Sequence, residues 1–181
     1  MTCCSPSADQ RPARRVDAIR LEFLFLDETL CKPCRGTDEA LDEAIRIVAA
    51  PLDALGLRLE VARILIATEE EAVTNRLLSS PTIRIDGVDI DPTVTEGPCE
   101  SCGDLAGGQT TVTCRRWYWK GAAYAAAPTG KIVEAILAAA TSPGAQAPGC
   151  CETAPLEAAY ALPQNLQGFF AARRAGAPVC C

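Results

Sequence analysis

The chain has 181 residues, of which 17 are basic and 23 acidic, for a formal net charge of -6. An acidic balance lacks the basic footprint that nucleic acid or an anionic membrane needs, so neither is expected as a partner. Histidine is absent and cysteine occurs 11 times. The first count excludes histidine-dependent catalytic triads, dyads and metal sites, and the second makes sulfur the element on which any chemistry would rest.

The first regular elements are expected to be a buried strand and a helix, after a flexible arm at residues 1–15 that is rich in Ser, Pro, Asp and Arg. Apolar residues occupy both alternating faces of residues 16–26, which is typical of a central strand covered on both sides. Thr37 is predicted to cap the helix that follows. Its apolar stripe runs through residues 41–55, where Pro51 is expected to kink or divide the helix.

A second strand, a short helix and a hairpin are predicted next. Apolar and charged residues alternate at the start of the strand predicted over residues 57–66. Thr68 and Glu71 have the spacing of a capping box, which predicts a short helix that reaches Leu78. Residues 82–90 are predicted to form two strands that turn at Asp86-Gly87.

The last third combines a loop, an aromatic strand, a helix and a tail. Residues 91–114 are rich in Pro, Gly and Thr and are expected to form an inserted loop that carries three cysteines. Residues 116–124 predict an aromatic strand with a turn, and Thr129 begins a last helix. Residues 141–181 are predicted to be a flexible tail, in which residues 163–174 form a short helix that docks through its apolar side chains.

Targeting signals are expected to be absent. The polar and basic opening lacks the apolar stretch of a secretory signal, and no uncharged apolar run approaches the roughly 18 residues of a membrane span. We therefore expect a cytoplasmic protein without membrane insertion. Because cytosolic thiols are kept reduced, many cysteines there indicate metal or redox work more often than structural disulfides. A disulfide-stapled secreted domain is the alternative.

The cysteines fall into two CxxC pairs, three adjacent pairs and one single residue. Two residues between cysteines at a helix start let both sulfurs meet as a dithiol or a disulfide, and the helix N-terminus and cations such as Lys32 and Arg35 favour a thiolate. A CxxC retained without a function is the alternative. The groups are Cys31 with Cys34, Cys99 with Cys102, Cys3 with Cys4, Cys150 with Cys151, Cys180 with Cys181, and Cys114 alone.

A CxPC sequence directly after a buried strand, and Ser80-Pro81 directly before the third strand, resemble the thioredoxin-like superfamily. The resemblance implies an α/β domain over residues 16–140, with a mixed four- or five-stranded sheet flanked by helices. It also implies an exposed nucleophile at Cys31 on the edge of the sheet, a resolving thiol at Cys34, and a cis peptide bond before Pro81, which would shape the partner groove.

Two features depart from thioredoxins. Leu30 stands where they usually carry tryptophan, and Gly36-Thr37 predicts that the regular helix begins only after the CxPC sequence. The chain also resembles a bacterial thioredoxin-like family of unknown function. The features that carry this resemblance are the later CxxC, Cys114-Arg115 with aromatic residues after it, and the run from Gly121 into the last helix. That second resemblance implies a fold and no activity.

Cys99, Cys102 and Cys114 form a possible triad of soft ligands within one segment. Structural zinc usually takes four ligands, so a fourth would have to come from elsewhere. Three thiolates suit trivalent arsenic, a mercuric ion or a cuprous ion, because soft ligands select soft ions. A Cys99–Cys102 disulfide and a Cys114 that is simply buried as a small hydrophobic residue are the alternatives.

The three adjacent pairs suit the capture and transfer of a soft ion by ligand exchange. Their pattern is similar to that of the arsenic metallochaperone that feeds an arsenite efflux ATPase, and the similarity implies an efflux or detoxification protein as a partner. A third cysteine close to Cys3-Cys4, as in that family, is missing.

The leading hypothesis is a cytosolic thiol protein that binds and passes on a thiophilic metal or metalloid, with no organic cofactor. In this hypothesis all 11 cysteines are candidate ligands. The first alternative is a thiol-disulfide oxidoreductase that uses Cys31, Cys34 and Pro81 and is served by a thiol reductant. The second is an interaction module stapled by zinc.

Overall fold

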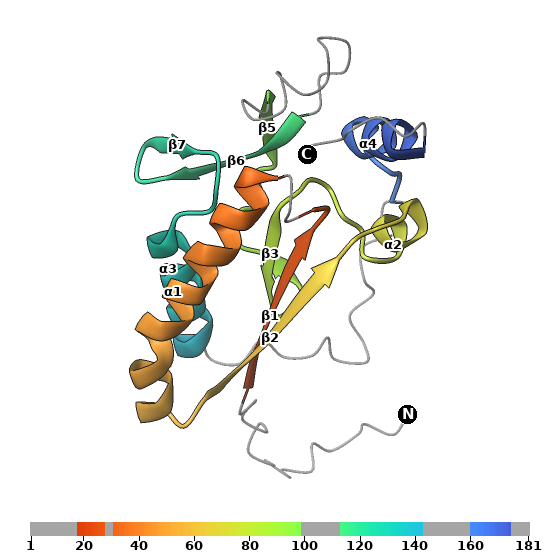
Figure 1. Ribbon diagram of the computed structural model, residues 1–181. Helices are drawn as coiled ribbons and strands as arrows, with labels where there is room; N and C mark the ends of the chain where they lie inside the picture. The colour runs from red at the N-terminus through yellow and green to blue at the C-terminus, as the bar shows by residue number, and fades with distance from the viewer. Residues whose placement is uncertain (1–17, 28–30, 99–112, 143–159, 175–181) are drawn as a thin grey trace, which may run out of the picture.

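The computed structural model describes residues 18–27, 31–98, 113–142 and 160–174, and all structural statements below concern these residues. Their architecture confirms the predicted α/β class, with a mixed four-stranded sheet of order β2-β1-β3-β4, a small antiparallel sheet of order β5-β6-β7 and four helices (Figure 1). In chain order the elements are β1 (Ala18–Phe25), α1 (Lys32–Ala54), β2 (Arg58–Leu65), α2 (Glu69–Thr74), β3 (Thr82–Ile85), β4 (Val88–Asp89), β5 (Thr95–Pro98), β6 (Thr113–Trp119), β7 (Ala122–Tyr124), α3 (Thr129–Thr141) and α4 (Gln164–Arg174).

Strand β1 lies in the interior of the sheet, as its apolar sequence predicts. It pairs in parallel with β2, where Leu21 is opposite Val61, and antiparallel with β3, where Leu21 is opposite Ile85. Phe23 and Leu24 point to opposite faces of the sheet, and both side chains are fully buried. The strand that leads to the CxPC sequence therefore has a paired strand on each side.

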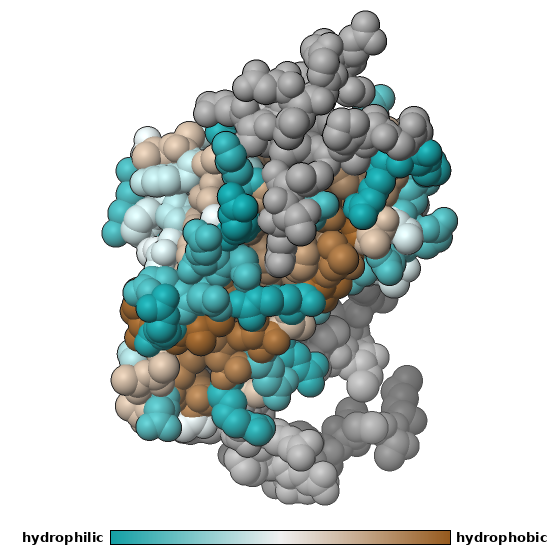
Figure 2. Space-filling view, in the orientation of Figure 1, coloured by the Kyte–Doolittle hydropathy of each residue, from teal (hydrophilic) through white to brown (hydrophobic). Residues whose placement is uncertain are grey.

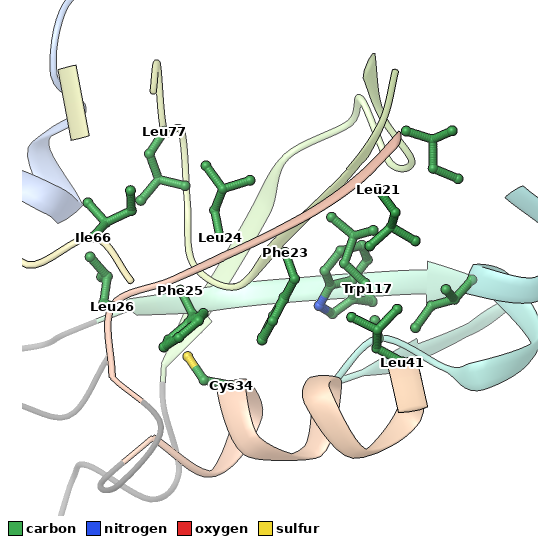
Figure 3. Packing of buried hydrophobic residues seen from close by; sticks show 14 of the residues in the cluster. Leu21, Phe23, Leu24, Phe25, Leu26, Cys34, Leu41, Ile66, Leu77 and Trp117 are labelled. Carbon is green, nitrogen blue, oxygen red and sulfur yellow. The ribbon is translucent and has the colours of Figure 1, made fainter. Parts of the chain in front are cut away.

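Helices cover both sides of β1. Helices α1 and α3 contact each other on the same side of the sheet (Figure 1). Figure 3 shows Cys34 and α1 on one side of β1, with Leu24, Ile66 and Leu77 on the other. Helices α2 and α4 contact each other at one end of the sheet (Figure 1). None of the helices in the described part of the chain is long and apolar enough to cross a membrane.

Helix α1 differs from its prediction at both ends. It begins at Lys32 and not after the CxPC sequence, because Cys31 occupies the N-cap and Pro33 lies in the first turn, where no backbone N–H is needed. Thr37 is therefore inside the helix and not its cap. Pro51 lies inside the helix, which continues past it to Ala54, so the proline does not divide the helix.

The local signals of the middle segment are confirmed, while the loop prediction is incomplete. Thr68 and Glu71 form the predicted capping box, and the hairpin turns at Asp86 and Gly87, both with positive φ. Helix α2 ends at Thr74, before the predicted limit. The segment predicted as an inserted loop contains strand β5, which pairs with the start of β6. The cross-strand partner, and not the local composition, makes this segment a strand.

The predicted short helix in the tail exists and is docked. Helix α4 buries Leu166, Phe169 and Phe170 against the core. The predicted arm and most of the predicted tail lie outside the described residues, so their expected flexibility stays a prediction.

Candidate functional site

The CxPC pair lies between the end of β1 and the first turn of α1. The sulfur of Cys31 accepts a hydrogen bond from the backbone N–H of Cys34, 3.1 Å away, so this thiol itself caps the helix. Both cysteine side chains are 0% exposed. The prediction that Cys31 is exposed at the sheet edge is therefore wrong. Its sulfur turns inward to satisfy an amide of the first helical turn instead of facing solvent.

The thiol of Cys34 meets the loop before β3. Its Sγ lies 3.5 Å from Oγ of Ser80, and in Figure 3 it points from α1 toward Phe25. The same Oγ accepts the backbone N–H of Leu26 at 3.2 Å. A hydroxyl has one hydrogen and two lone pairs, so Ser80 can accept from Leu26 and also form a hydrogen bond with the sulfur. The Ser80–Pro81 bond is cis, as predicted, and Pro81 is buried.

The loop that carries Ser80 is tied to neighbouring strands. The backbone N–H of Arg115 donates to the carbonyl of Ser80 at 3.0 Å, and the hydroxyl of Thr82 donates to the carbonyl of Ser79 at 2.8 Å. The hydroxyl of Ser79 in turn donates to the carboxylate of Glu96 at 2.6 Å. The position of Ser80 against Cys34 is therefore set by β3, β5 and β6 together.

Beside this loop, Arg115 forms a buried ionic network that was not predicted from the sequence. The residue is 0% exposed, and its guanidinium forms two hydrogen bonds with Asp89, at 2.8 and 2.9 Å. It also donates to the hydroxyl of Thr82 at 2.8 Å and to the backbone carbonyl of Asp91. Its guanidinium carbon lies 4.4 Å above the Trp117 ring. The alternation of Arg115 and Trp117 in an aromatic strand was the available signal that this arginine faces inward.

On the opposite side of the site, β2 is linked to α1 by charge. Figure 2 shows hydrophobic surface between these two elements, interrupted by polar side chains. Arg63 of β2 donates to Asp38 at 2.7 Å and to Asp42 at 2.5 Å, and both carboxylates belong to α1. The hydrogen bond with Asp38 raises the pKa of Arg63 above its ordinary value. Two ion pairs thus link the helix that carries the thiols to the edge strand of the sheet.

The predicted set of metal ligands is brought together only in part. Cys31 and Cys34 meet at the start of α1, and Cys114 is a buried free thiol in β6. Within the described ranges no three Cys, His, Asp or Glu residues are placed to hold a metal ion, so these three cysteines do not form a shared site. The remaining cysteines lie outside the described residues, so their predicted roles are not tested: Cys3, Cys4, Cys99, Cys102, Cys150, Cys151, Cys180 and Cys181.

Comparison with protein families gives one result. A family model described as a domain of unknown function, DUF2703, matches residues 19–136. The matched span runs from β1 into α3 and contains Cys31, Cys34, the Ser80–Pro81 bond and Arg115. No curated protein and no solved structure gives a significant match.

Proposed function

Because this chain belongs to the DUF2703 family, whose description assigns no function, we propose a function from the geometry of the site: the Cys31–Cys34 pair is a dithiol that reduces disulfides by thiol–disulfide exchange. One observation carries the proposal. The sulfur of Cys31 accepts the N–H of Cys34 at 3.1 Å, at the start of a helix of 23 residues. This donor and the helix dipole stabilise negative charge on the sulfur, which both attack and departure of a thiolate require.

The exchange proceeds in two balanced steps. The Cys31 thiolate attacks one sulfur of a substrate disulfide, a mixed disulfide forms, and the other substrate sulfur leaves as a thiolate. The Cys34 thiolate then attacks the Cys31 sulfur and expels the second substrate sulfur. Two electrons pass to the substrate, and a Cys31–Cys34 disulfide remains. An external dithiol reductant restores the two thiols.

The contact between Ser80 and Cys34 supports the second step. When Cys34 becomes the attacking thiolate, the hydroxyl of Ser80, 3.5 Å away, can donate to its sulfur and hold it in place. Both thiols are buried, however, so a substrate disulfide reaches Cys31 only after part of the surrounding chain has moved. The site therefore combines a prepared dithiol with restricted access.

The test is disulfide reduction with insulin as the substrate and a small dithiol as the reductant. Cys31→Ser is expected to abolish the activity, whereas Cys34→Ser is expected to accumulate mixed disulfides, because only the resolving step is lost. Cys114→Ser is the matched control, since Cys114 is also a buried cysteine but belongs to β6 and not to the start of α1. Wild-type protein without activity, or equal losses in Cys31→Ser and Cys114→Ser, would contradict the proposal.

Binding of a thiophilic ion is the second candidate, and the three adjacent cysteine pairs in the sequence favour it. Two thiols at the start of α1 supply two ligands for a mercuric, cuprous or arsenite species, and the adjacent pairs are candidates for capture and transfer. Each ligand thiol loses a proton on binding, so affinity should rise as pH rises toward the ordinary thiol pKa of about 8.5.

Native mass spectrometry of the reduced protein, titrated with each ion and with zinc, measures this binding. The Cys31→Ser, Cys34→Ser double variant is compared with the Cys180→Ser, Cys181→Ser double variant. Loss of an ion only in the first variant would assign binding to the described dithiol, and loss in both would indicate joint capture. Unchanged stoichiometry in both variants would remove the second candidate.

A further inference from the structure

The segment Tyr160–Arg174 lies beyond the span matched by the family model and packs onto the domain through one helix. Leu166, Phe169 and Phe170 of α4 are each no more than 3% exposed. Arg174 forms an ion pair with Glu69 of α2 at 2.8 Å, and Figure 1 shows the two helices side by side. This packing is extensive enough to fix the segment against the domain.

The same segment binds the backbone of the loop that faces the thiols. The hydroxyl of Tyr160 donates to the carbonyl of Leu77 at 2.5 Å, and the side-chain amide of Asn165 lies 3.5 Å from the carbonyl of Leu78. These two carbonyls immediately precede Ser79, Ser80 and the cis Pro81. The C-terminal segment therefore holds the strand-entry loop only two residues from the hydroxyl that touches Cys34.

A single carboxylate joins this segment to the site. Glu96 of β5 accepts hydrogen bonds from Ser79 at 2.6 Å, from Thr113 of β6 at 2.8 Å, and from the amide of Asn165. All three donors are neutral side chains, and each comes from a different part of the fold. When α4 leaves, Glu96 loses one of the three donors that fix it, and the hold of Glu96 on Ser79 should loosen.

We propose that Tyr160–Arg174 is an intramolecular latch that controls access to the Cys31–Cys34 dithiol by fixing residues 77–81 through Glu96. This inference rests on the proposed function, because a buried dithiol can react with a substrate disulfide only after the chain around it has moved. With the latch docked, Ser80 is held against Cys34 and both thiols are enclosed. With the latch released, the loop moves and the thiols become reachable.

The test measures the rate at which iodoacetamide alkylates Cys31 and Cys34 in the reduced full-length protein, with each peptide quantified by mass spectrometry. Phe169→Asp places a charge in the buried face of α4. Ala171→Asp introduces the same charge at an exposed position two residues away. Leu52→Ala removes a buried side chain from the last turn of α1 and controls for general loss of stability.

We expect Phe169→Asp to raise the alkylation rate at least tenfold, equivalent to about 1.4 kcal/mol of lost docking free energy. Ala171→Asp should match the wild type, and Leu52→Ala should not reproduce the increase at equal loss of global stability. Equal rates in wild type and Phe169→Asp, or an equal increase in Leu52→Ala, would overturn the latch. If Phe169→Asp fails to unfold cooperatively, the milder Tyr160→Phe, Asn165→Ala variant decides by the same criterion.

Alkylation does not require disulfide exchange, so the two proposals can fail separately. Faster alkylation of the Phe169→Asp variant together with an inactive wild type would retain the latch and reject the oxidoreductase. If the wild type reduces insulin but its thiols are alkylated as fast as those of the variant, the oxidoreductase is retained and the latch is rejected.

Discussion

Replacement of Asp89 with alanine tests the energetic role of the buried guanidinium. Arg115 is 0% exposed, and its bidentate partner Asp89 retains 18% exposure of its side chain. Removal of one partner from a buried ion pair costs about 3–5 kcal/mol, because the other charge is left unpaired. Thr82 and the Asp91 carbonyl still accept hydrogen bonds from Arg115, so we expect the lower end of the range, about 3 kcal/mol.

A loss of that size is a large fraction of the about 5–15 kcal/mol that stabilises a typical domain. For a chain of this length it should lower Tm by about 6–12 °C, at about 2–4 °C per kcal/mol. Urea unfolding followed by tryptophan fluorescence measures the effect, since Trp117 is buried directly beneath the guanidinium. Glu60→Ala is the control, because the pair formed by Glu60 and Arg20 is exposed and should contribute less than about 1 kcal/mol.

The double variant Asp89→Leu, Arg115→Met separates the ion pair from the penalty of an unpaired charge. It should recover part of the loss caused by Asp89→Ala, since no charge then stays buried without a partner. A loss below about 1 kcal/mol for Asp89→Ala, matching the exposed control, would refute the reasoning, because the guanidinium would then be stabilised without Asp89.

Two further predictions concern the glycines of α3 and α4 and the phenol of Tyr160. A Cβ at Gly130 would lie 2.2 Å from the Trp119 ring, so Gly130→Ala should lower Tm. Nothing lies within 4 Å of a Cβ at Gly168 in α4, so Gly168→Ala should stabilise the protein by about 0.5–1 kcal/mol through its higher helix propensity. Thermal melts of both variants check these opposite signs. Burial raises the pKa of Tyr160 above its ordinary value of 10.0, so the neutral phenol that donates to Leu77 is favoured in the folded state. The stabilisation that this phenol contributes is complete below pH about 10 and is lost as pH rises through the higher pKa of the folded state. The free energy of unfolding should therefore fall more steeply above pH 10 in wild type than in Tyr160→Phe. Parallel pH–stability curves for the two proteins would contradict this prediction.

Local patterns predicted most of the secondary structure. The two-sided apolar run made β1 an internal strand, and the spacing of Thr68 and Glu71 marked the start of α2. The hairpin at Asp86-Gly87 followed from residues that tolerate positive φ. In each case the residues that decide the structure lie within a few positions of one another, so the sequence alone contains the interaction.

The features that escaped prediction depend on partners far away in the chain. Arg115 is buried because Asp89, 26 residues earlier, neutralises it. The docking of α4 relies on Leu77, which is 83 residues from Tyr160, and on Glu96, which is 69 residues from Asn165. The CxPC pair was found from its spacing and its place after β1. The inward turn of Cys31 was missed, because the choice between solvent and the helix amides is made by the packing around it.

The backbone amide of Leu26 gives the loop a built-in reporter. This residue directly follows β1, and its N–H is held by the hydroxyl of Ser80 rather than by a neighbouring strand. Its exchange with solvent deuterium is therefore governed by the loop, while the amides of β1 are protected by the sheet. In a hydrogen-exchange experiment, Leu26 would record each excursion of residues 77–81 even when the strand beside it stays closed. One amide thus separates local opening at the dithiol from unfolding of the domain.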